Sequence, residues 1–163
     1  MTDTAPTSAP APDTTQPVFI IEKIYVKDLS LEIPNAPQIF LEREQPQVEI
    51  GLQSDAKNIA ENISEVTLTV TVTSKLGEKT QFLVETTQAG IFQIRNVPEA
   101  DLQLVLAVTC PTILLPYARE TISDAITRAG FPPVLLAPMN FEAIYRQRLE
   151  QQAQQPAQGT PIQ

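Results

Sequence analysis

The stretch from Cys110 to Phe141 restricts the possible folds of this chain more than any other part. Its residues, CPTILLPYARETISDAITRAGFPPVLLAPMNF, combine a proline-bounded helical pattern with an extended apolar run. Pro116 suits a first helical turn, where its missing N–H costs nothing, and apolar residues then recur at helical spacing. Gly130 and the proline pair after it predict the end of this helix. The following run, 134–139, has no polar face, so it must be covered by the sheet, another subunit or a ligand.

Four segments that precede this stretch show the alternation of half-buried strands. They are Val18–Ile33, Gln47–Gln53, about Glu65–Thr73, and Thr80–Thr87. A turn at Lys75–Lys79 joins the last two, and helical patterns follow only after them. The chain is therefore predicted to be α+β, with a four-stranded antiparallel sheet packed on C-terminal helices.

The helical part is predicted to contain three pieces. The segment Leu102–Val108 is apolar on most sides, so we expect a helix buried all round. Pro111 is expected to interrupt it, with a second helix starting near Pro116. Asn140 is a good N-cap for a last helix. One helix of this kind on one sheet leaves its far side bare, so the sequence predicts a partner subunit.

The connection after the first strand contains an apolar knot, Ile39-Phe40-Leu41, before the charged residues Glu42-Arg43-Glu44. A long connection with an exposed apolar tip is often functional. The alternative is that Phe40 simply fills the core. The sequence leaves both interpretations open.

Composition excludes several classes of function. The formal net charge of −8, without a block of basic residues, argues against nucleic-acid binding. The chain has no histidine, one cysteine and five dispersed glycines, which removes histidine-based catalysis, zinc ligation by histidine and phosphate-binding loops. We therefore expect no enzyme activity and no cofactor. Cys110 is expected to be a buried structural thiol.

The same composition bears on localisation and domain limits. The N-terminus lacks the charged and apolar regions of a secretory signal, and no run approaches the ~20 apolar residues of a membrane span. We therefore expect a cytoplasmic protein with no direct membrane insertion. Segments 1–17 and 152–163 are rich in proline, threonine, alanine and glutamine, and both are predicted to be disordered tails around one domain, 18–151.

Four motifs in collinear order resemble the signature stretches of the SecB-type protein-export chaperones. They are KIYVKDLSLE-x-PNAP, GIF, CP-x-ILLPYARE-x-IS and R-x-GFPP-x-x-LAPMNF. The resemblance extends from about Phe19 to Gln151. It implies a homotetramer built as a dimer of dimers, which binds unfolded precursor proteins in apolar grooves and delivers them to the motor ATPase SecA.

The resemblance also implies two sets of site residues. On the second strand and in the crossing loop, the client-binding positions are Phe40, Val48, Ile50 and Leu52. The uncovered apolar arm adds two candidates from its own pattern, Leu135 and Leu136. The SecA-binding positions are Asp28, Glu32, Leu83 and Glu85. A plain solvated strand face is the other interpretation of this second set.

One residue departs from the family pattern, which often has an aromatic side chain where this chain has Glu44. Other functions also stay open. A SecB-like chaperone can serve one toxin–antitoxin pair, and a structural assembly subunit with one fixed partner could use the same surfaces. Binding of many unrelated unfolded chains would distinguish a general chaperone from either alternative.

Overall fold

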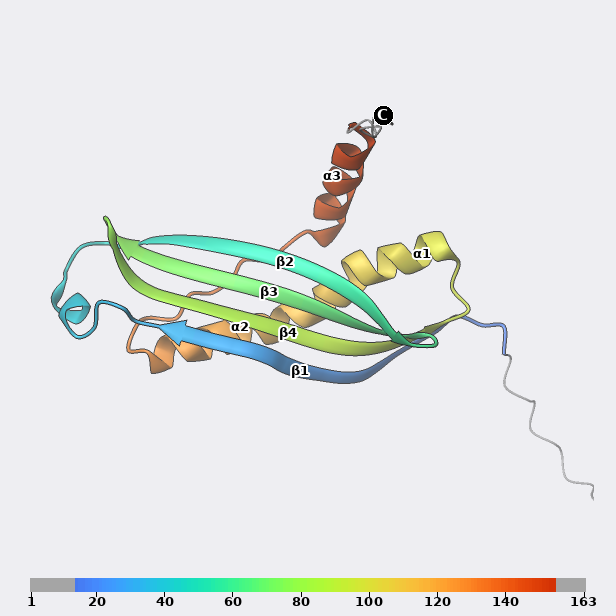
Figure 1. The fold of residues 1–163 in the computed structure, drawn as a ribbon, viewed down its shortest axis with the longest axis horizontal. Helices are drawn as coiled ribbons and strands as arrows, with labels where there is room; N and C mark the ends of the chain where they lie inside the picture. The colour runs from blue at the N-terminus through green and yellow to red at the C-terminus, as the bar shows by residue number, and fades with distance from the viewer. Residues whose placement is uncertain (1–13, 155–163) are drawn as a thin grey trace, which may run out of the picture.

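The computed structural model describes residues 14–154, and residues 1–13 and 155–163 lie outside the described part. Four strands form one sheet in the order β1-β4-β3-β2, with every neighbouring pair antiparallel. Their bounds are Val18–Glu32 for β1, Gln47–Ala60 for β2, Ile63–Leu76 for β3 and Lys79–Arg95 for β4. The predicted α+β class and the four-stranded antiparallel sheet are confirmed (Figure 1).

The strands β2 and β4 are longer than the sequence pattern predicted. The second half of β2 is polar, and the end of β4 contains Ala89 and Gly90, so neither shows a clear alternation. Pairing with β3 along their whole length supplies the backbone hydrogen bonds that local preference alone would not specify. The predicted turn at Gly77 is confirmed, because this glycine has a φ of 58° between β3 and β4.

Strand β1 contains two β-bulges, where its register with β4 shifts between Ile21 and Lys23 and again between Val26 and Asp28. Side chains of β4 reach across to the second bulge. Thr86 Oγ1 donates to the carbonyl of Asp28, and Gln88 Nε2 donates to the carbonyl of Tyr25. These bonds satisfy backbone groups at an irregular edge and fix the bulge.

A single long helix, 99–128, crosses one face of the sheet and packs on it mainly through its carboxy-terminal part (Figure 1). It consists of α1 (Glu99–Leu104), a π-helical segment η2 (Val105–Thr109) and α2 (Cys110–Arg128). The predicted interruption at Pro111 and restart near Pro116 are therefore wrong. Pro111 lies in the first turn of α2 directly after the wider π turn, where its missing N–H is tolerated. Pro116 lies inside α2 on an exposed face, so water can reach the carbonyl that it leaves unpaired.

The core lies between α2 and the face of the sheet formed by alternate residues of β3 and β4. From the helix it includes Cys110, Leu114, Ala118 and Ile122, all without exposed surface. From the sheet it includes Val66, Leu68, Val70, Val72, Val84 and Phe92, which are likewise fully buried. Gly90 leaves room for the Phe92 ring, because a Cβ at position 90 would lie 2.6 Å from that ring.

The amino-terminal third of the long helix is not buried within the chain. No residue of α1 or η2 is fully buried, and Leu104 is 42% exposed. The expectation of a helix buried all round is thus not met by one chain alone, because the sheet packs mainly on α2 and covers η2 only in part, at β2. By length and composition the continuous helix could cross a membrane, whereas the two shorter helices predicted from the sequence could not. Its α2 portion instead packs as a core helix on the sheet.

The remaining segments connect these layers. The crossing loop holds a short 3₁₀ helix, η1 (Gln38–Leu41), and the arm after α2 leads to α3 (Phe141–Gln154), which projects away from the sheet (Figure 1). The N-cap prediction is confirmed, because Asn140 Oδ1 accepts from the N–H of Ala143 at 3.0 Å. The predicted stop is also confirmed, since α2 ends at Arg128 and Gly130 has a φ of 92°.

The two predicted tails overlap the described part only at their inner ends. Asn96 Nδ2 donates to the carbonyls of Thr14 at 2.8 Å and of Gln16 at 2.9 Å, so this short segment is tied to the end of β4. At the other terminus α3 continues to Gln154. The rest of each predicted tail lies outside the described residues.

Candidate functional site

Strand β2 forms one edge of the sheet and carries a row of apolar side chains on the helix-covered face. Val48, Ile50 and Leu52 lie opposite Ser74, Val72 and Val70 of β3, all three of which are buried. The row itself is not buried, because α2 does not extend over the edge: Ile50 is 50% exposed. The sequence pattern therefore placed these three candidates correctly on one face.

Two adjoining depressions lie along this edge. The first, of about 160 Å³, is lined almost entirely by apolar residues: Ile50, Leu52, Leu115, Leu136, Ala137 and Met139. The second, of about 200 Å³, continues toward α3 and is lined by Leu52, Ser54, Ala107, Met139, Phe141, Ile144, Tyr145 and Arg148. Both share Leu52 and Met139, so together they form one long groove, which we call the β2 groove.

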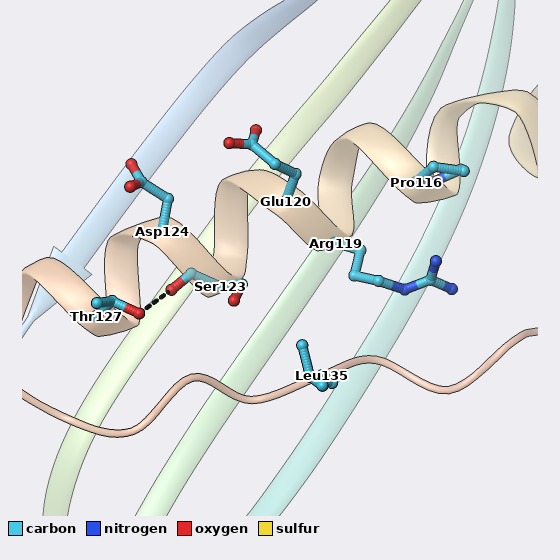
Figure 2. A pocket seen from close by; sticks show the side chains of 7 residues that line it. All are labelled: Pro116, Arg119, Glu120, Ser123, Asp124, Thr127 and Leu135. Atoms are coloured by element: carbon cyan, nitrogen blue, oxygen red, sulfur yellow. Dashed lines mark hydrogen bonds between the residues drawn. The ribbon is translucent and has the colours of Figure 1, made fainter.

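Leu135 and Leu136 point to opposite sides of the arm. Leu136 is buried and forms part of the β2 groove, whereas Leu135 is 74% exposed. Leu135 lines a separate open depression against α2, with Pro116 and Thr127 at its two ends (Figure 2). Arg119 fixes the arm between these surfaces, since its Nε donates to the Leu136 carbonyl at 2.9 Å. The structure therefore brings Leu136, but not Leu135, together with Ile50 and Leu52.

The crossing loop places its apolar residues in different environments. Ile39 fills the core with 2% of its surface exposed, whereas Phe40 remains 48% exposed and stacks on Phe131 with ring centroids 5.0 Å apart. The next residue, Leu41, is 80% exposed. Gly130 makes room for the stack, because a Cβ there would lie 3.3 Å from the Phe40 ring. Phe40 thus presents an aromatic surface on the loop, outside the lining of the β2 groove.

Sequence reasoning missed Met139 and Tyr145 as members of the groove. Met139 was noted only as part of an apolar arm, although its flexible thioether is typical of surfaces that bind varied apolar partners. Tyr145 belongs to an apolar stripe at helical spacing on the last helix, with Phe141, Ile144 and Leu149. The sequence feature that could have identified Tyr145 is this apolar stripe, because an apolar helix face packs against another apolar surface.

The opposite face of the sheet, which we call the outer face, carries the second set of candidates. Asp28 lies opposite Thr87, Ser30 opposite Glu85, and Glu32 opposite Leu83 in the β1–β4 register. Leu83 and Glu85 are partly buried, and Asp28 and Glu32 are exposed. The four predicted docking residues therefore lie side by side on adjacent strands and on one face. On β3 the same face is a row of threonines, Thr67 to Thr73.

One end of the outer face is fixed by a charged network. Tyr25 donates its hydroxyl to Glu65, which also pairs with Lys27 at 2.7 Å. The bond to the carboxylate, with burial, raises the pKa of Tyr25 to about 12. Lys27 first and Tyr25 second hold the pKa of Glu65 below its usual value. Ala89 lies opposite Tyr25 on the intervening strand β4, and its small side chain leaves the phenol room to cross.

The titratable groups within residues 14–154 do not form a metal centre. Groups of three or more potential metal ligands are absent from this part. Cys110 has no exposed surface, and burial raises the pKa of its thiol to about 12, so it is not a thiolate at neutral pH. What the geometry does offer is a long apolar groove beside a free strand edge, together with an acidic face. These features suit binding of extended polypeptides.

Comparison with solved structures defines the class of fold. Three-quarters of the chain, 75%, superposes on 91% of the SecB-like chaperone of Mycobacterium tuberculosis, solved in complex with a peptide from an antitoxin, with a TM-score of 0.63. The sequence identity is only 16%, so this likeness establishes the fold alone.

The sequence comparisons establish the family. The model of the preprotein translocase subunit SecB matches residues 12–152. The chain is 63% identical over 148 residues to the protein-export protein SecB of Dechloromonas aromatica, covering 91% of this chain and 97% of the relative. It is 67% identical to the SecB of Aromatoleum aromaticum, covering 80% of this chain and 83% of the relative. The chain belongs to the SecB family and is a protein-export chaperone rather than a member of an enzyme family.

Proposed function

We propose that the protein is a holdase, which binds unfolded precursor proteins reversibly along the β2 groove and keeps them competent for export. The observation that carries this proposal is the continuous apolar groove beside the free edge of β2. An unfolded chain offers apolar side chains and unpaired backbone groups, and the groove and the strand edge provide partners for both. The solved SecB-like chaperone that shares this fold is in complex with a peptide, which supports the proposal.

Affinity for long clients comes from several grooves acting together. A half-exposed apolar side chain contributes on the order of 1 kcal/mol when a client covers it, and each ordered client residue costs a similar amount. One groove therefore holds weakly. Several grooves in one assembly raise the affinity through effective concentration, by a factor on the order of 100 or more.

A homotetramer, built as a dimer of dimers, supplies these grooves. The exposed apolar surface supports this proposal: α1 and η2 contain no fully buried residue, and β1 exposes Phe19, Ile20, Ile21, Val26 and Leu29 by 40–48% each. Leaving such surface in water costs about 25 cal/mol per Å². Phe40 and Leu135 then act as outlying contacts for clients that leave the groove.

The outer face docks the motor SecA. Asp28, Glu32 and Glu85 supply negative charge, and the partly buried Leu83 supplies an apolar anchor. The grooves face the other side of the sheet, so one complex can hold a client and dock the motor together. The protein works in the cytoplasm, as a soluble assembly with no cofactor.

The test is a comparison of clients of different length. Two unrelated, permanently unfolded proteins and a 15-residue peptide from one of them are titrated into the purified protein, with binding followed by calorimetry. Both proteins should bind at least about 100-fold more tightly than the peptide. Binding of one protein only would instead favour a dedicated chaperone or an assembly subunit. Equal affinity for peptide and protein would contradict the use of several grooves.

A further inference from the structure

Three carboxylates surround Ser30 on the outer face. Asp28 and Glu32 lie two residues before and after it on β1, and Glu85 lies directly opposite it on β4. Diagonal neighbours across antiparallel strands are about 7–8 Å apart, close enough for like charges to repel one another. A face that must present negative charge to a partner therefore needs something that holds these carboxylates in place and apart.

Thr71 supplies that contact for one of them. It lies on β3 directly opposite Glu85, on the side away from β1, and its Oγ1 donates to Glu85 Oε2 at 2.7 Å. The bond draws the carboxylate toward β3 and so away from Asp28 and Glu32. On the far side of Thr71, β2 has Gly51, so the position directly opposite on that strand carries no side chain that competes for the hydroxyl.

The bond leaves Glu85 available to a partner. A carboxylate can accept about four hydrogen bonds, and Thr71 uses one position on Oε2. Within residues 14–154 the other oxygen, Oε1, has no hydrogen-bond donor, so it can accept from a lysine or arginine. Because Glu85 is partly buried and already held, less side-chain freedom is lost when a cation binds.

We propose that Thr71 is a positioning residue of the docking face, which orients the Glu85 carboxylate for a cationic group of the docking partner. This inference rests on the proposed docking function and adds a residue that touches Glu85 rather than the motor. The count of charges on the face does not depend on Thr71; only the placement of one charge does.

The experiment measures the affinity of the purified tetramer for SecA as a function of salt concentration. Thr71→Val keeps the β-branched shape and removes the hydroxyl, and it should weaken binding about threefold to fivefold with an unchanged salt slope. Thr71→Ser keeps the hydroxyl and should restore wild-type affinity. Glu85→Gln should weaken binding and also reduce the salt slope, because it removes a charge.

Two controls isolate the contact. Thr69→Val removes a hydroxyl from the same strand and face, where Thr69 Oγ1 lies 3.1 Å from Thr87 Oγ1 and not on a carboxylate, so affinity should be unchanged. In the Glu85→Gln background, Thr71→Val should have no further effect. Circular dichroism and affinity for an unfolded client should be the same for all variants.

The outcomes separate the two levels of the proposal. If Glu85→Gln binds SecA normally, the docking function of this face is wrong. If Glu85→Gln weakens binding while Thr71→Val does not, only the positioning role is wrong. An equal loss from Thr71→Val and Thr71→Ser, or a loss from Thr71→Val that persists in the Glu85→Gln background, would also overturn the positioning role.

Discussion

Replacing Ile50 by aspartate separates the role of the β2 groove from the role of the core. Full burial of an isoleucine side chain stabilises by about 1.5–3 kcal/mol. Ile50 is 50% exposed, so folding has used about half of this, on the order of 1 kcal/mol. A similar amount remains for a client to gain by covering the rest.

The part of the Ile50 burial energy that stabilises the fold and the part left for a client predict different consequences for Ile50→Asp. Loss of about 1 kcal/mol from a typical stability of 5–15 kcal/mol leaves the subunit folded. A client loses at least the same amount in each groove that it covers, because the carboxylate must also lose water beneath it. For a client that spans two grooves this loss is about 2 kcal/mol, which raises the dissociation constant roughly 30-fold.

The assay combines circular dichroism, light scattering and fluorescence anisotropy of a labelled unfolded protein. Ile59→Asp is the matched control, because Ile59 lies on the same strand with 47% exposure but outside the β2 groove. It should retain client binding. Val72→Asp, at the fully buried position opposite Ile50, should unfold the subunit. An unfolded Ile50→Asp protein, or a folded one with normal client affinity, would refute the reasoning.

Three further predictions test other parts of the structure. Ile39→Ala removes the buried anchor of the crossing loop and should cost about 2–5 kcal/mol, measured as the free energy of unfolding in urea; an unchanged midpoint would contradict that anchoring role. Because Lys27 and Tyr25 lower the pKa of Glu65 from its reference value of 4.5, their network should stabilise the fold fully above about pH 4.5 and lose this contribution as the pH falls through the lowered pKa. Glu65→Gln should therefore flatten the acid side of the stability–pH curve, and an unaltered acid limb would count against the network. Asn140→Ala removes the N-cap and should cost α3 about 1 kcal/mol, seen as faster hydrogen exchange confined to that helix.

The bulges of β1 show how far the sequence could predict the sheet. The residues on the helix-covered face are Phe19, Ile21, Ile24, Val26, Leu29, Leu31 and Ile33, so the spacing is two except at two steps of three. Each step of three coincides with a register shift. The pattern was therefore present in the sequence, but a search for strict alternation finds only its last part, from Leu29.

Other features depend on contacts that no local pattern contains. Proline is a helix breaker by local rules, yet the π turn before Pro111 and the exposed position of Pro116 let one helix run from 99 to 128. The arm has no periodicity, so which leucine faces the groove depends on tertiary contacts, among them the burial of Leu136 and the bond from Arg119 to its carbonyl. Alternation did place Asp28 with Glu32, and Leu83 with Glu85, on the faces where the structure has them. Their meeting on one surface follows from the β1–β4 pairing, which a single sequence does not reveal.

The irregular edge of β1 also bears on solubility. A flat sheet with two open edges invites copies to add edge to edge without end, as in a fibre. A regular strand cannot continue the hydrogen-bond ladder past the two positions where β1 has an extra residue. The bulges thus restrict what can pair there to strands with a matching irregularity. Unlimited addition of regular strands at this edge of the sheet is thereby disfavoured.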